Sequence, residues 1–598
     1  MAELREELVE RIVSGEQHDY FDVIGWEPGT GKTLTAYDGI VQAVERGRRV
    51  LLVRYTAENT QEAETAINDR AGKVIAAAFH SRRYVSNAAK RDFLDCAHEW
   101  PVVVITHKRY QLLSADVHQR NQLVAGRSIL IIDEFPDMVE EVAVDLETIH
   151  ALEEVLSRFS AVRQLFREVV AGIEDGLILM EAETGSRYVR LSEAPAEETW
   201  GRLSRLIREQ CDGKKLCSWY RYLVSEEEVP DVFGKEISIG ALCKRIEGLR
   251  LFYESTSVYS GGKLIAADPG KWFWTIDGVN ILLDASGDFQ PAYRVNPELF
   301  RKRERKSVLD HSRWTIEHVR CNTTSYGQSR IDNFYKCVQQ RAEEYGPKTL
   351  LVGSKRDMDK LDQIEADRKT YHHNLIGSNQ WRDMENVIVC KTPAVSDAVI
   401  LLRYLYYARG ASENLPCADV ITGPGRREYA DQRLEEFRVL DRVNHVYQAV
   451  KRVNRDMSRD TAVVLIMEDE QVVRLLAECL KGCEVKTVSA AEWGFDRSAK
   501  ERYDERRREN SYAEKFKRLS LEILRGGHRD LEYRPKSGRY VPGKFKKKTI
   551  QDYLGVGDTS NFRRLVLEKG EVTRFCEEHH ITISRCYIEF PAQDRLAA

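Results

Sequence analysis

Long apolar stretches are missing from this chain of 598 residues. No run of about 18 apolar residues occurs, so we expect no membrane-spanning helix. The N-terminal residues 1–17 are charged and helical in pattern, without the apolar core of a secretion signal, and we therefore expect a cytoplasmic protein. The 12 cysteines are scattered and form no CxxC pair, which favours reduced thiols over a disulfide framework or a zinc site.

The chain also lacks a strong excess of charge of one sign, because its net charge is only −4. Lys and Arg nevertheless concentrate between residues 497 and 548. A protein that is acidic overall can still present a basic face to a polyanion such as nucleic acid. The length is too great for one hydrophobic core, and at about 100–200 residues per domain it predicts roughly three to five domains.

Short apolar runs alternate with helical patterns in two parts of the chain. In the first part, after an amphipathic helix at 1–17, strands are predicted at 21–26, 48–56, 73–79, 101–107 and 128–135. In the second part, strands are predicted at 348–354, 386–392, 398–407 and 461–469. Buried strands that alternate with helices indicate parallel sheets wrapped by helices.

The region between these two parts has apolar residues at helical spacing, which predicts a mostly helical insertion. Sheet-like pattern returns with WFWTI (272–276) and VNILLDASGD (279–288). The predicted fold class is α/β: two parallel-sheet lobes, a mostly helical insertion, and a small C-terminal helical domain for which a winged-helix form is one option. The expected organisation is a first lobe at 1–140, an insertion at 141–275, the end of the first lobe with a linker at 276–311, a second lobe at 312–490, a basic linker at 491–548 and a C-terminal helical domain at 549–598.

A glycine-rich loop follows the first predicted strand. The run GWEPGTGKT (25–33) matches the second half of the phosphate-loop pattern, Gly-x-Gly-Lys-Thr, and Trp26 stands where that pattern usually has its first glycine. Gly29 and Gly31, on either side of Thr30, permit backbone angles that turn several N–H groups toward a phosphate. A strand before the loop and a helix after it are the context that this motif requires.

Two side chains at the end of the loop complete a nucleotide-phosphate site. Lys32 would reach the β- and γ-phosphates of ATP, and the Thr33 hydroxyl would ligate Mg²⁺. The helix that follows adds its positive N-terminal end. The alternative is a chance glycine-rich turn, which the strand–loop–helix context argues against.

An acidic pair ends another predicted strand. The run SILIIDEF (128–135) delivers Asp133 and Glu134 after a buried apolar stretch. An acid at this position can hold Mg²⁺, directly or through water, and the adjacent Glu134 can orient and deprotonate an attacking water. A surface acidic turn is the alternative, and the phosphate loop upstream makes hydrolysis the favoured interpretation.

The order of these motifs resembles that of the superfamily 2 helicases, in which Asp133-Glu134-Phe135-Pro136 would be the DExx box. Six further segments match the family in the expected order: 50–60, 102–110, 281–288, 348–361, 376–389 and 444–456. In the segment 102–110, Thr106 and His107 are candidate contacts to the nucleic-acid backbone. The matching residues in the later segments are Ala285 and Ser286; Gly377, Asn379 and Asp383; and Gln448, Arg452 and Arg455. The resemblance covers about residues 20–140 and 275–470. It implies two RecA-like lobes with ATP in the cleft between them, and Gln448, Asp383 and Gly377 among the nucleotide-site residues.

Arg452 and Arg455 are the second strongest match. Arginine is always charged and forks onto phosphate oxygens. Three residues apart on a helix, the two side chains would share one face, and from the second lobe they would stabilise charge on the transferring γ-phosphate. The alternative is a solvated basic helix.

The insertion resembles the arch of the iron–sulfur DNA-repair helicases, but one feature of that group is absent. Its four cysteines lie between the phosphate loop and the DExx box, where this chain has only Cys96. We therefore expect no iron–sulfur cluster. Cys211, Cys217 and Cys243 fit no zinc spacing and are interpreted as buried structural thiols.

A motor of this class must hold the nucleic-acid backbone, and unpaired bases can stack on aromatic side chains. Tyr55 and Trp381 are candidates for stacking, with core packing as the alternative for each. The C-terminal run KFKKKTIQDYLGVGDTSNFRRLVLEKG (544–570), with Arg563 and Arg564, resembles a helix-turn-helix or winged-helix DNA reader. Protein docking and a solvated basic surface are its alternatives.

The function that we predict is an ATP-dependent DNA helicase or translocase, with ATP and Mg²⁺ as cofactors and a single DNA strand as its track. The insertion or the C-terminal domain could in addition dock a protein partner. Two alternatives remain: a nucleic-acid-stimulated ATPase that remodels or clamps without unwinding, and a non-catalytic nucleic-acid-binding scaffold. The architecture would suit replication or defence functions of bacteria, phages or mobile elements.

Overall fold

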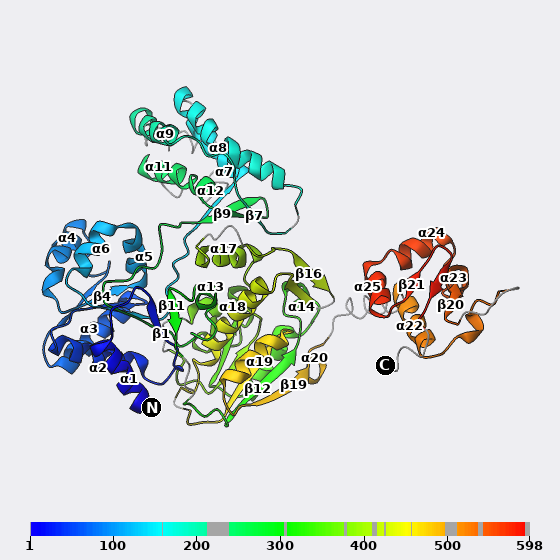
Figure 1. Ribbon diagram of the computed structural model, residues 1–598. Helices are drawn as coiled ribbons and strands as arrows, with labels where there is room; N and C mark the ends of the chain where they lie inside the picture. Colours follow the sequence, from blue (N-terminus) through cyan, green and yellow to red (C-terminus); the bar gives the residue numbers. More distant parts are fainter. Residues whose placement is uncertain are drawn as a thin grey trace. The chain divides into compact units, whose positions relative to one another are not determined.

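The chain folds into two compact units in the computed structural model, which describes residues 2–157, 159–183, 185–211, 239–303, 308–375, 380–409, 415–423, 426–455, 457–496, 511–535 and 542–591. The first unit consists of Met1–Thr324 and Tyr335–Trp493, and the second of Ser325–Phe334 and Gly494–Ala598 (Figure 1). None of the described helices is both long and apolar enough to span a membrane.

A seven-stranded sheet forms the first lobe of the first unit. In sheet order its strands are β11 (Phe300–Lys302), β1 (Phe21–Ile24), β10 (Val279–Leu283), β5 (Ile129–Asp133), β2 (Val50–Arg54), β4 (Val102–Thr106) and β3 (Ala76–Phe79). All neighbouring strands are parallel. The central strands are buried along their whole length, as expected for a sheet that is covered on both faces.

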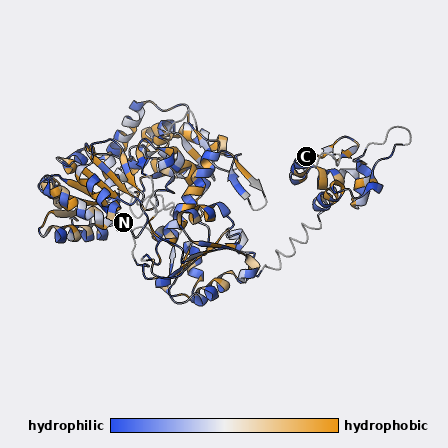
Figure 2. Ribbon diagram, turned by 60° about the horizontal axis from the view of Figure 1, so that its bottom comes forward, coloured by the Kyte–Doolittle hydropathy of each residue, from blue (hydrophilic) through white to orange (hydrophobic). Residues whose placement is uncertain are grey.

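Helices cover this sheet and connect its strands. They are α1 (Ala2–Ser14), α2 (Lys32–Glu45), α3 (Ala57–Ala71), α4 (Asn87–Cys96), η1 (Ala97–Glu99), α5 (His107–Ala115), α6 (Val117–Val124) and α13 (Pro291–Val295). The apolar faces of α1 and α2 pack in one cluster with residues of the strands. Hydrophobic residues are concentrated in the strands, and hydrophilic residues dominate the outer surfaces of the helices (Figure 2).

A six-stranded parallel sheet forms the second lobe. Its order is β14 (Lys369–Tyr371), β13 (Thr349–Gly353), β15 (Asn386–Val389), β18 (Thr461–Ile466), β12 (Trp314–Arg320) and β19 (Glu484–Ser489). The accompanying elements are α15 (Phe334–Glu344), α16 (Lys355–Lys360), η2 (Ala366–Arg368), η3 (His372–Asn374), α17 (Asp397–Tyr407), the hairpin of β16 (Val420–Gly423) and β17 (Arg426–Tyr429), α18 (Gln432–Val450), α19 (Glu470–Cys479) and α20 (Ala490–Trp493). The predicted α/β class with two parallel-sheet lobes is therefore confirmed.

One predicted strand of the second lobe is wrong. Residues 398–407 form most of helix α17, not a strand, and Ser396 caps this helix by accepting a hydrogen bond from the Val399 amide. The run is apolar on nearly all sides because most of the helix surface is buried. Apolar periodicity alone does not separate a buried helix from a buried strand. The run WFWTI (272–276) likewise forms no strand, although it leads into β10.

The insertion contains a sheet as well as helices. Strands β6 (Glu141–Asp145), β9 (Lys263–Ala267), β8 (Ser257–Ser260) and β7 (Arg187–Val189) form a four-stranded antiparallel sheet. The described helices are α7 (Leu146–Leu156), α8 (Ser160–Met180), α9 (Glu197–Gln210), α11 (Ile239–Gly248) and α12 (Leu251–Glu254). The strands escaped sequence analysis because each is only three to five residues long. Cys211 and Cys243 are buried free thiols, whereas Cys217 lies outside the described residues.

The second unit is a small α+β domain. Its elements are α14 (Ser325–Gln328), α22 (Tyr512–Leu524), η5 (Arg529–Leu531), β20 (Lys544–Lys546), α23 (Lys547–Tyr553), α24 (Thr559–Phe562), a π-helical turn η6 (Arg563–Leu567), α25 (Gly570–Glu578), β21 (Thr582–Ile583) and β22 (Tyr587–Glu589). The three strands form an antiparallel sheet in the order β20-β22-β21. The C-terminal part is therefore not purely helical.

Helix α22 corrects the prediction of a linker at 491–548. Its residues Ala513, Phe516, Leu519 and Ile523 are buried in the core of the second unit. Their spacing is that of one helix face, and Ser511 caps the helix by accepting from the Glu514 amide. The high charge of this region obscured the apolar face, because the charged residues occupy the other side of the same helix.

Candidate active site

The glycine-rich loop joins β1 to α2. Gly29 and Gly31 have φ values of 88° and 82°, the left-handed conformation that glycine adopts without a steric penalty. Gly29 also passes close to the second lobe, since a Cβ built on it would lie 2.9 Å from the backbone oxygen of Arg455. Thr30 closes the loop on itself, because its hydroxyl donates to the backbone oxygen of Glu27 at 2.7 Å.

Trp26 has a packing function that its position in the motif did not reveal. The side chain is 5% exposed and lies in the cluster that contains Leu8 and Ile12 of α1 and Ile40 of α2. The indole therefore fills the space between the loop and the helices that support it.

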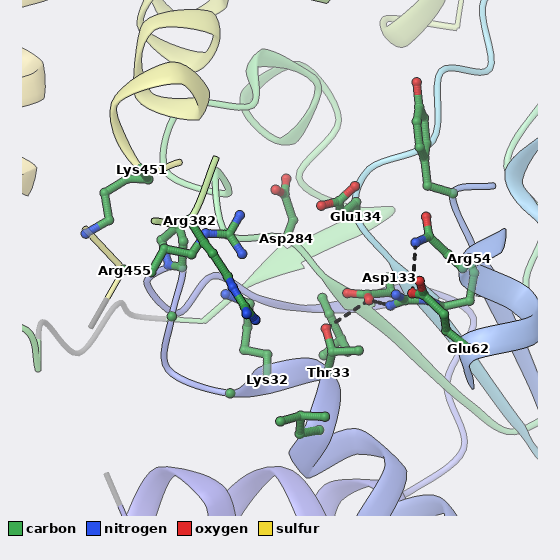
Figure 3. A pocket seen from close by; sticks show the side chains of 18 of the residues that line it. Lys32, Thr33, Arg54, Glu62, Asp133, Glu134, Asp284, Arg382, Lys451 and Arg455 are labelled. Carbon is green, nitrogen blue, oxygen red and sulfur yellow. Dashed lines mark hydrogen bonds and ion pairs between the residues drawn. The ribbon is translucent and has the colours of Figure 1, made fainter. Parts of the chain in front are cut away.

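Lys32, at the first position of α2, is buried, and its side chain points back toward the glycine-rich loop. Its Nζ donates to the backbone oxygen of Trp26 and to that of Glu27, the latter at 3.2 Å. The ammonium group is thus held against the backbone of the loop, and Lys32 lies beside Thr33 at the start of α2 (Figure 3).

Thr33 and Asp133 meet at the end of β5. The Thr33 hydroxyl donates to Asp133 Oδ2 at 2.9 Å, and Arg54, at the end of the neighbouring strand β2, forms an ion pair with the same carboxylate oxygen (Figure 3). Mg²⁺ prefers oxygen ligands and usually takes only one or two from protein, with water and substrate phosphates completing its shell. The Thr33 and Asp133 oxygens fit that ion. In the described residues, no cluster of three or more His, Cys, Asp or Glu side chains could hold a metal.

Glu134 has a strained backbone at the end of β5. Its φ is 71°, a conformation that costs a residue with a side chain free energy and is concentrated at functional sites. The Glu134 amide donates to the Leu283 oxygen of β10 at 2.8 Å, which fixes the turn. Carboxylate oxygen Oε2 is buried without a hydrogen-bond partner.

His107 contacts the backbone of this turn. It is buried, and its Nε2 lies 2.9 Å from the backbone oxygen of Asp133. Burial, with a smaller effect of the Arg54 charge, lowers the pKa of His107 to about 3. The ring is therefore neutral and donates through Nε2, since a carbonyl only accepts. His107 thus contacts the acidic turn, and Thr106, the other residue predicted to contact nucleic acid, caps α5 through its side chain.

The second lobe contributes side chains from the end of α18. Arg452 Nη2 donates to Gln448 Oε1 at 3.2 Å and lies 4.0 Å from Glu134 Oε1. Burial lowers the pKa of Arg452, and burial together with the Arg452 charge lowers that of Arg455 to about 10. The helix ends at Val450, so both arginines lie in the turn that follows it and do not share a helix face as predicted.

Gln448 also joins the two lobes directly. Its Nε2 donates to Ser286 Oγ at 3.1 Å. Ser286 in turn donates from its hydroxyl and its amide to Asp284 Oδ1, at 2.7 and 2.9 Å. Tyr293 donates to Asp284 Oδ2 at 2.8 Å. The segment after β10 is therefore a buried polar network that links the first lobe to α18, and burial raises the pKa of Asp284 within it.

Residues of both lobes line one cavity of about 630 Å³. Among the predicted residues that line it are Gly29, Gly31, Lys32, Thr33, Asp133, Glu134, Ala285, Gln448, Arg452 and Arg455. Tyr55, 37% exposed, also lines the cavity and contacts the His107 ring edge-on. Two lobes thus contribute charged groups to one space.

Other predicted residues lie elsewhere. The Asp383 side chain is 86% exposed and pairs with Arg382, so it does not reach the cavity in this structure. Trp381 is 3% exposed and donates through its indole to the Asp367 oxygen, which excludes it as a stacking surface. Gly377 and Asn379 lie outside the described residues.

Sequence analysis missed Arg54, Arg382 and Lys451, which also line the cavity. Each lies within one of the matching segments (50–60, 376–389 and 444–456), but it was not singled out there. The signal for Arg54 was its position at the C-terminal end of a predicted strand, where parallel strands collect their functional side chains.

Comparisons with known proteins give a similarity in fold. No family model and no curated protein matches the chain. Among solved structures, S. tokodaii Xpd4 is similar over 81% of this chain and 99% of its own, with 12% identity and a TM-score of 0.48. The DEAD-box helicase Mss116 bound to ssRNA is similar over 96% and 91% (10% identity, TM-score 0.34), and the DUF1998 helicase MrfA bound to DNA over 98% and 57% (9%, 0.33). At these identities and TM-scores the comparisons report a likeness in fold alone.

Proposed function

We propose that the chain is an ATP hydrolase that converts hydrolysis between its two lobes into movement along nucleic acid, with DNA as the preferred track. The observation that carries this proposal is the cavity in which Lys32, Thr33, Asp133 and Glu134 of one lobe face Arg452 and Arg455 of the other. A site divided between two lobes can transmit a chemical change as a relative motion.

Lys32 is the phosphate-binding side chain. In the structure it donates to two backbone oxygens of its own loop. These are neutral acceptors, whereas phosphate oxygens are charged and bind an ammonium more strongly. The side chain therefore exchanges the loop carbonyls for the β- and γ-phosphates when ATP enters.

Thr33 and Asp133 would hold Mg²⁺, which when bound neutralises charge on the phosphates. Arg54 already pairs with the Asp133 carboxylate and supplies positive charge to the same oxygen. The guanidinium thereby keeps Asp133 oriented toward Thr33.

Glu134 is the proposed general base. Its buried Oε2 has no hydrogen-bond partner and can accept the proton of an attacking water. Arg452 and Arg455 stabilise the charge on the transferring phosphoryl group, and the Gln448–Ser286 hydrogen bond transmits the position of the arginines to the first lobe.

ATPase rates without nucleic acid and with single-stranded DNA, duplex DNA or RNA test this proposal. We expect stimulation by single-stranded DNA. Lys32→Ala should lower stimulated turnover at least about tenfold, because a charge-assisted phosphate contact is lost. Unchanged turnover in Lys32→Ala would show that the proposed site is not the site of hydrolysis, and absence of turnover in the unaltered chain would favour a binding scaffold.

A strand-displacement assay on forked DNA and RNA separates a helicase from its nearest alternative. ATP turnover with displacement supports unwinding. Turnover without displacement supports an ATPase that remodels or clamps nucleic acid.

The second unit supports DNA as the partner. Helix α23 is followed by the turn 554–558, in which Leu554 and Val556 are buried, and then by α24 and η6. Together with α25 and the sheet β20-β22-β21, this order supports a winged-helix arrangement. Such domains place the helix after the turn in the major groove. Arg563 and Arg564 are exposed on that segment.

We expect the double variant Arg563→Ala/Arg564→Ala to bind duplex DNA about tenfold more weakly and to show a shallower dependence of affinity on salt, because phosphate contacts are lost. Fluorescence anisotropy of a labelled duplex at several salt concentrations measures both quantities. Lys515→Ala/Arg518→Ala, which removes two exposed basic side chains from α22, is the control with the same change in charge. Equal losses in the control and the double variant would mean that only general charge matters.

A further inference from the structure

The segment that connects the lobes is anchored on the phosphate loop. Glu27, within the loop, is fully buried. Its Oε2 accepts hydrogen bonds from the backbone amides of Val308 and Leu309, both at 3.0 Å. Val308 also packs against the hydrophobic cluster that contains Trp26. The loop therefore holds the chain just before it enters β12 of the second lobe.

The same segment is anchored at its other end beside the arginines. His311 is fully buried, and Lys451 Nζ donates to its Nε2 at 2.9 Å. The His311 amide donates to the Lys481 oxygen at 2.9 Å, which fixes this end to the second lobe. Lys451 immediately precedes Arg452 and lines the same cavity. Residues 308–311 thus connect both halves of the site.

Glu27 links this segment to the phosphate-binding lysine. Its backbone oxygen accepts from Lys32 Nζ at 3.2 Å and from the Thr30 hydroxyl at 2.7 Å, while its carboxylate holds the amides of 308 and 309. Movement of Lys32 onto a phosphate removes one contact from the Glu27 peptide. Hydrogen bonds to a carboxylate are stronger than those between neutral groups. A shift of the Glu27 peptide is therefore transmitted through its carboxylate to the amides of 308 and 309 in the connecting segment.

We infer that Glu27 is a positioning residue that couples the phosphate loop to the connection between the lobes, and through His311 and Lys451 to Arg452. This inference rests on the proposed function, since it assigns Glu27 a part in closing the same ATP site. A role confined to shaping the loop is the competing explanation. If Glu27 couples the loop to the connection, hydrogen exchange at the amides of 308 and 309 changes when nucleotide binds. If Glu27 only shapes the loop, that exchange stays the same.

The test compares the full-length chain with Glu27→Ala, Glu27→Gln and Asn68→Ala. Asn68 is a matched control, because its Oδ1 also accepts two consecutive backbone amides, those of Ile75 and Ala76 at 2.8 Å each, but within one lobe. Hydrogen exchange by mass spectrometry follows the amides of 308 and 309 with and without ATP analogue. Fluorescent-nucleotide binding and nucleic-acid-stimulated turnover follow the function.

We expect Glu27→Ala to expose the amides of 308 and 309, to lower kcat about tenfold, and to change KM for ATP much less. Glu27→Gln retains an oxygen acceptor and should restore amide protection and most of kcat. Asn68→Ala should expose its own two amides and leave kcat unchanged.

Two results would overturn the inference. One is normal kcat in Glu27→Ala with the amides of 308 and 309 exposed. The other is loss of nucleotide binding equal to the loss of kcat, which would make Glu27 a loop-shaping residue. Absence of turnover in the unaltered chain would instead contradict the proposed function, while protection of the two amides could still be measured.

Discussion

Glu134→Gln is expected to bind ATP normally and to hydrolyse it about 10²–10⁴-fold more slowly. The substitution keeps the shape of the side chain but removes the oxygen that can accept a proton. Since Oε2 is buried without a hydrogen-bond partner in the structure, the carboxylate is free to accept that proton from water. Fluorescent-nucleotide binding and single-turnover hydrolysis measure the two steps separately.

Glu62 provides the control for this experiment. It is a carboxylate that lines the same cavity from α3 and accepts a hydrogen bond from Asn59 at 3.3 Å. Glu62→Gln should change single-turnover hydrolysis little. If Glu134→Gln hydrolysed ATP at a rate close to that of Glu62→Gln, another group would have to be the base. If it lost nucleotide binding as well, the carboxylate would have a structural function at the turn.

The positions of most strands along the chain could be predicted from the sequence, whereas their order in the sheet could not. Apolar runs located β1, β2, β4 and β5, and candidate site residues lie at or just after the C-terminal ends of these strands. Strand order was not predictable, because it depends on which helices cross which face of the sheet. In the register of β2 against β5, Val53 lies opposite Ile132, which places Arg54 beside Asp133. Without knowledge of the strand order, no sequence pattern connects these two distant residues.

Aromatic residues were the least predictable part of the site. Trp26 and Trp381 stand within matching motifs, yet both are buried, whereas Tyr55 lines the cavity. An aromatic ring can fill a core or stack on a base, and the local sequence is compatible with both. Burial is decided by neighbours from other segments, such as α1 for Trp26.

Arg452 and Arg455 line the cavity, but their local geometry differs from the predicted one. The two arginines were expected on one helical face. The helix ends at Val450, and Asn454, with a φ of 40°, turns the chain so that the cavity still receives both guanidinium groups. The spacing identified the residues, but the tertiary turn after α18 determines how they approach the other lobe.

Arg452→Ala is expected to lower kcat by about 10³-fold while nucleotide affinity changes little. The side chain is buried, lies 4.0 Å from the Glu134 carboxylate and is held by Gln448, so its charge is aimed at the position where a γ-phosphate would meet the base. Arg452→Lys should not rescue the rate, because an ammonium lacks the planar fork that binds two phosphate oxygens.

Arg442→Ala is the matched control for Arg452→Ala. Arg442 lies on α18, the helix that precedes Arg452, and pairs with Asp469 at 2.9 Å, so its removal should leave kcat near that of the unaltered chain. Steady-state turnover with single-stranded DNA, together with nucleotide binding, distinguishes the two variants. If Arg452→Ala kept more than about a tenth of the rate, a transition-state contribution of this size would not come from this residue. In that case Arg455, which lines the same cavity, would be the remaining candidate for stabilising the transferring phosphoryl group.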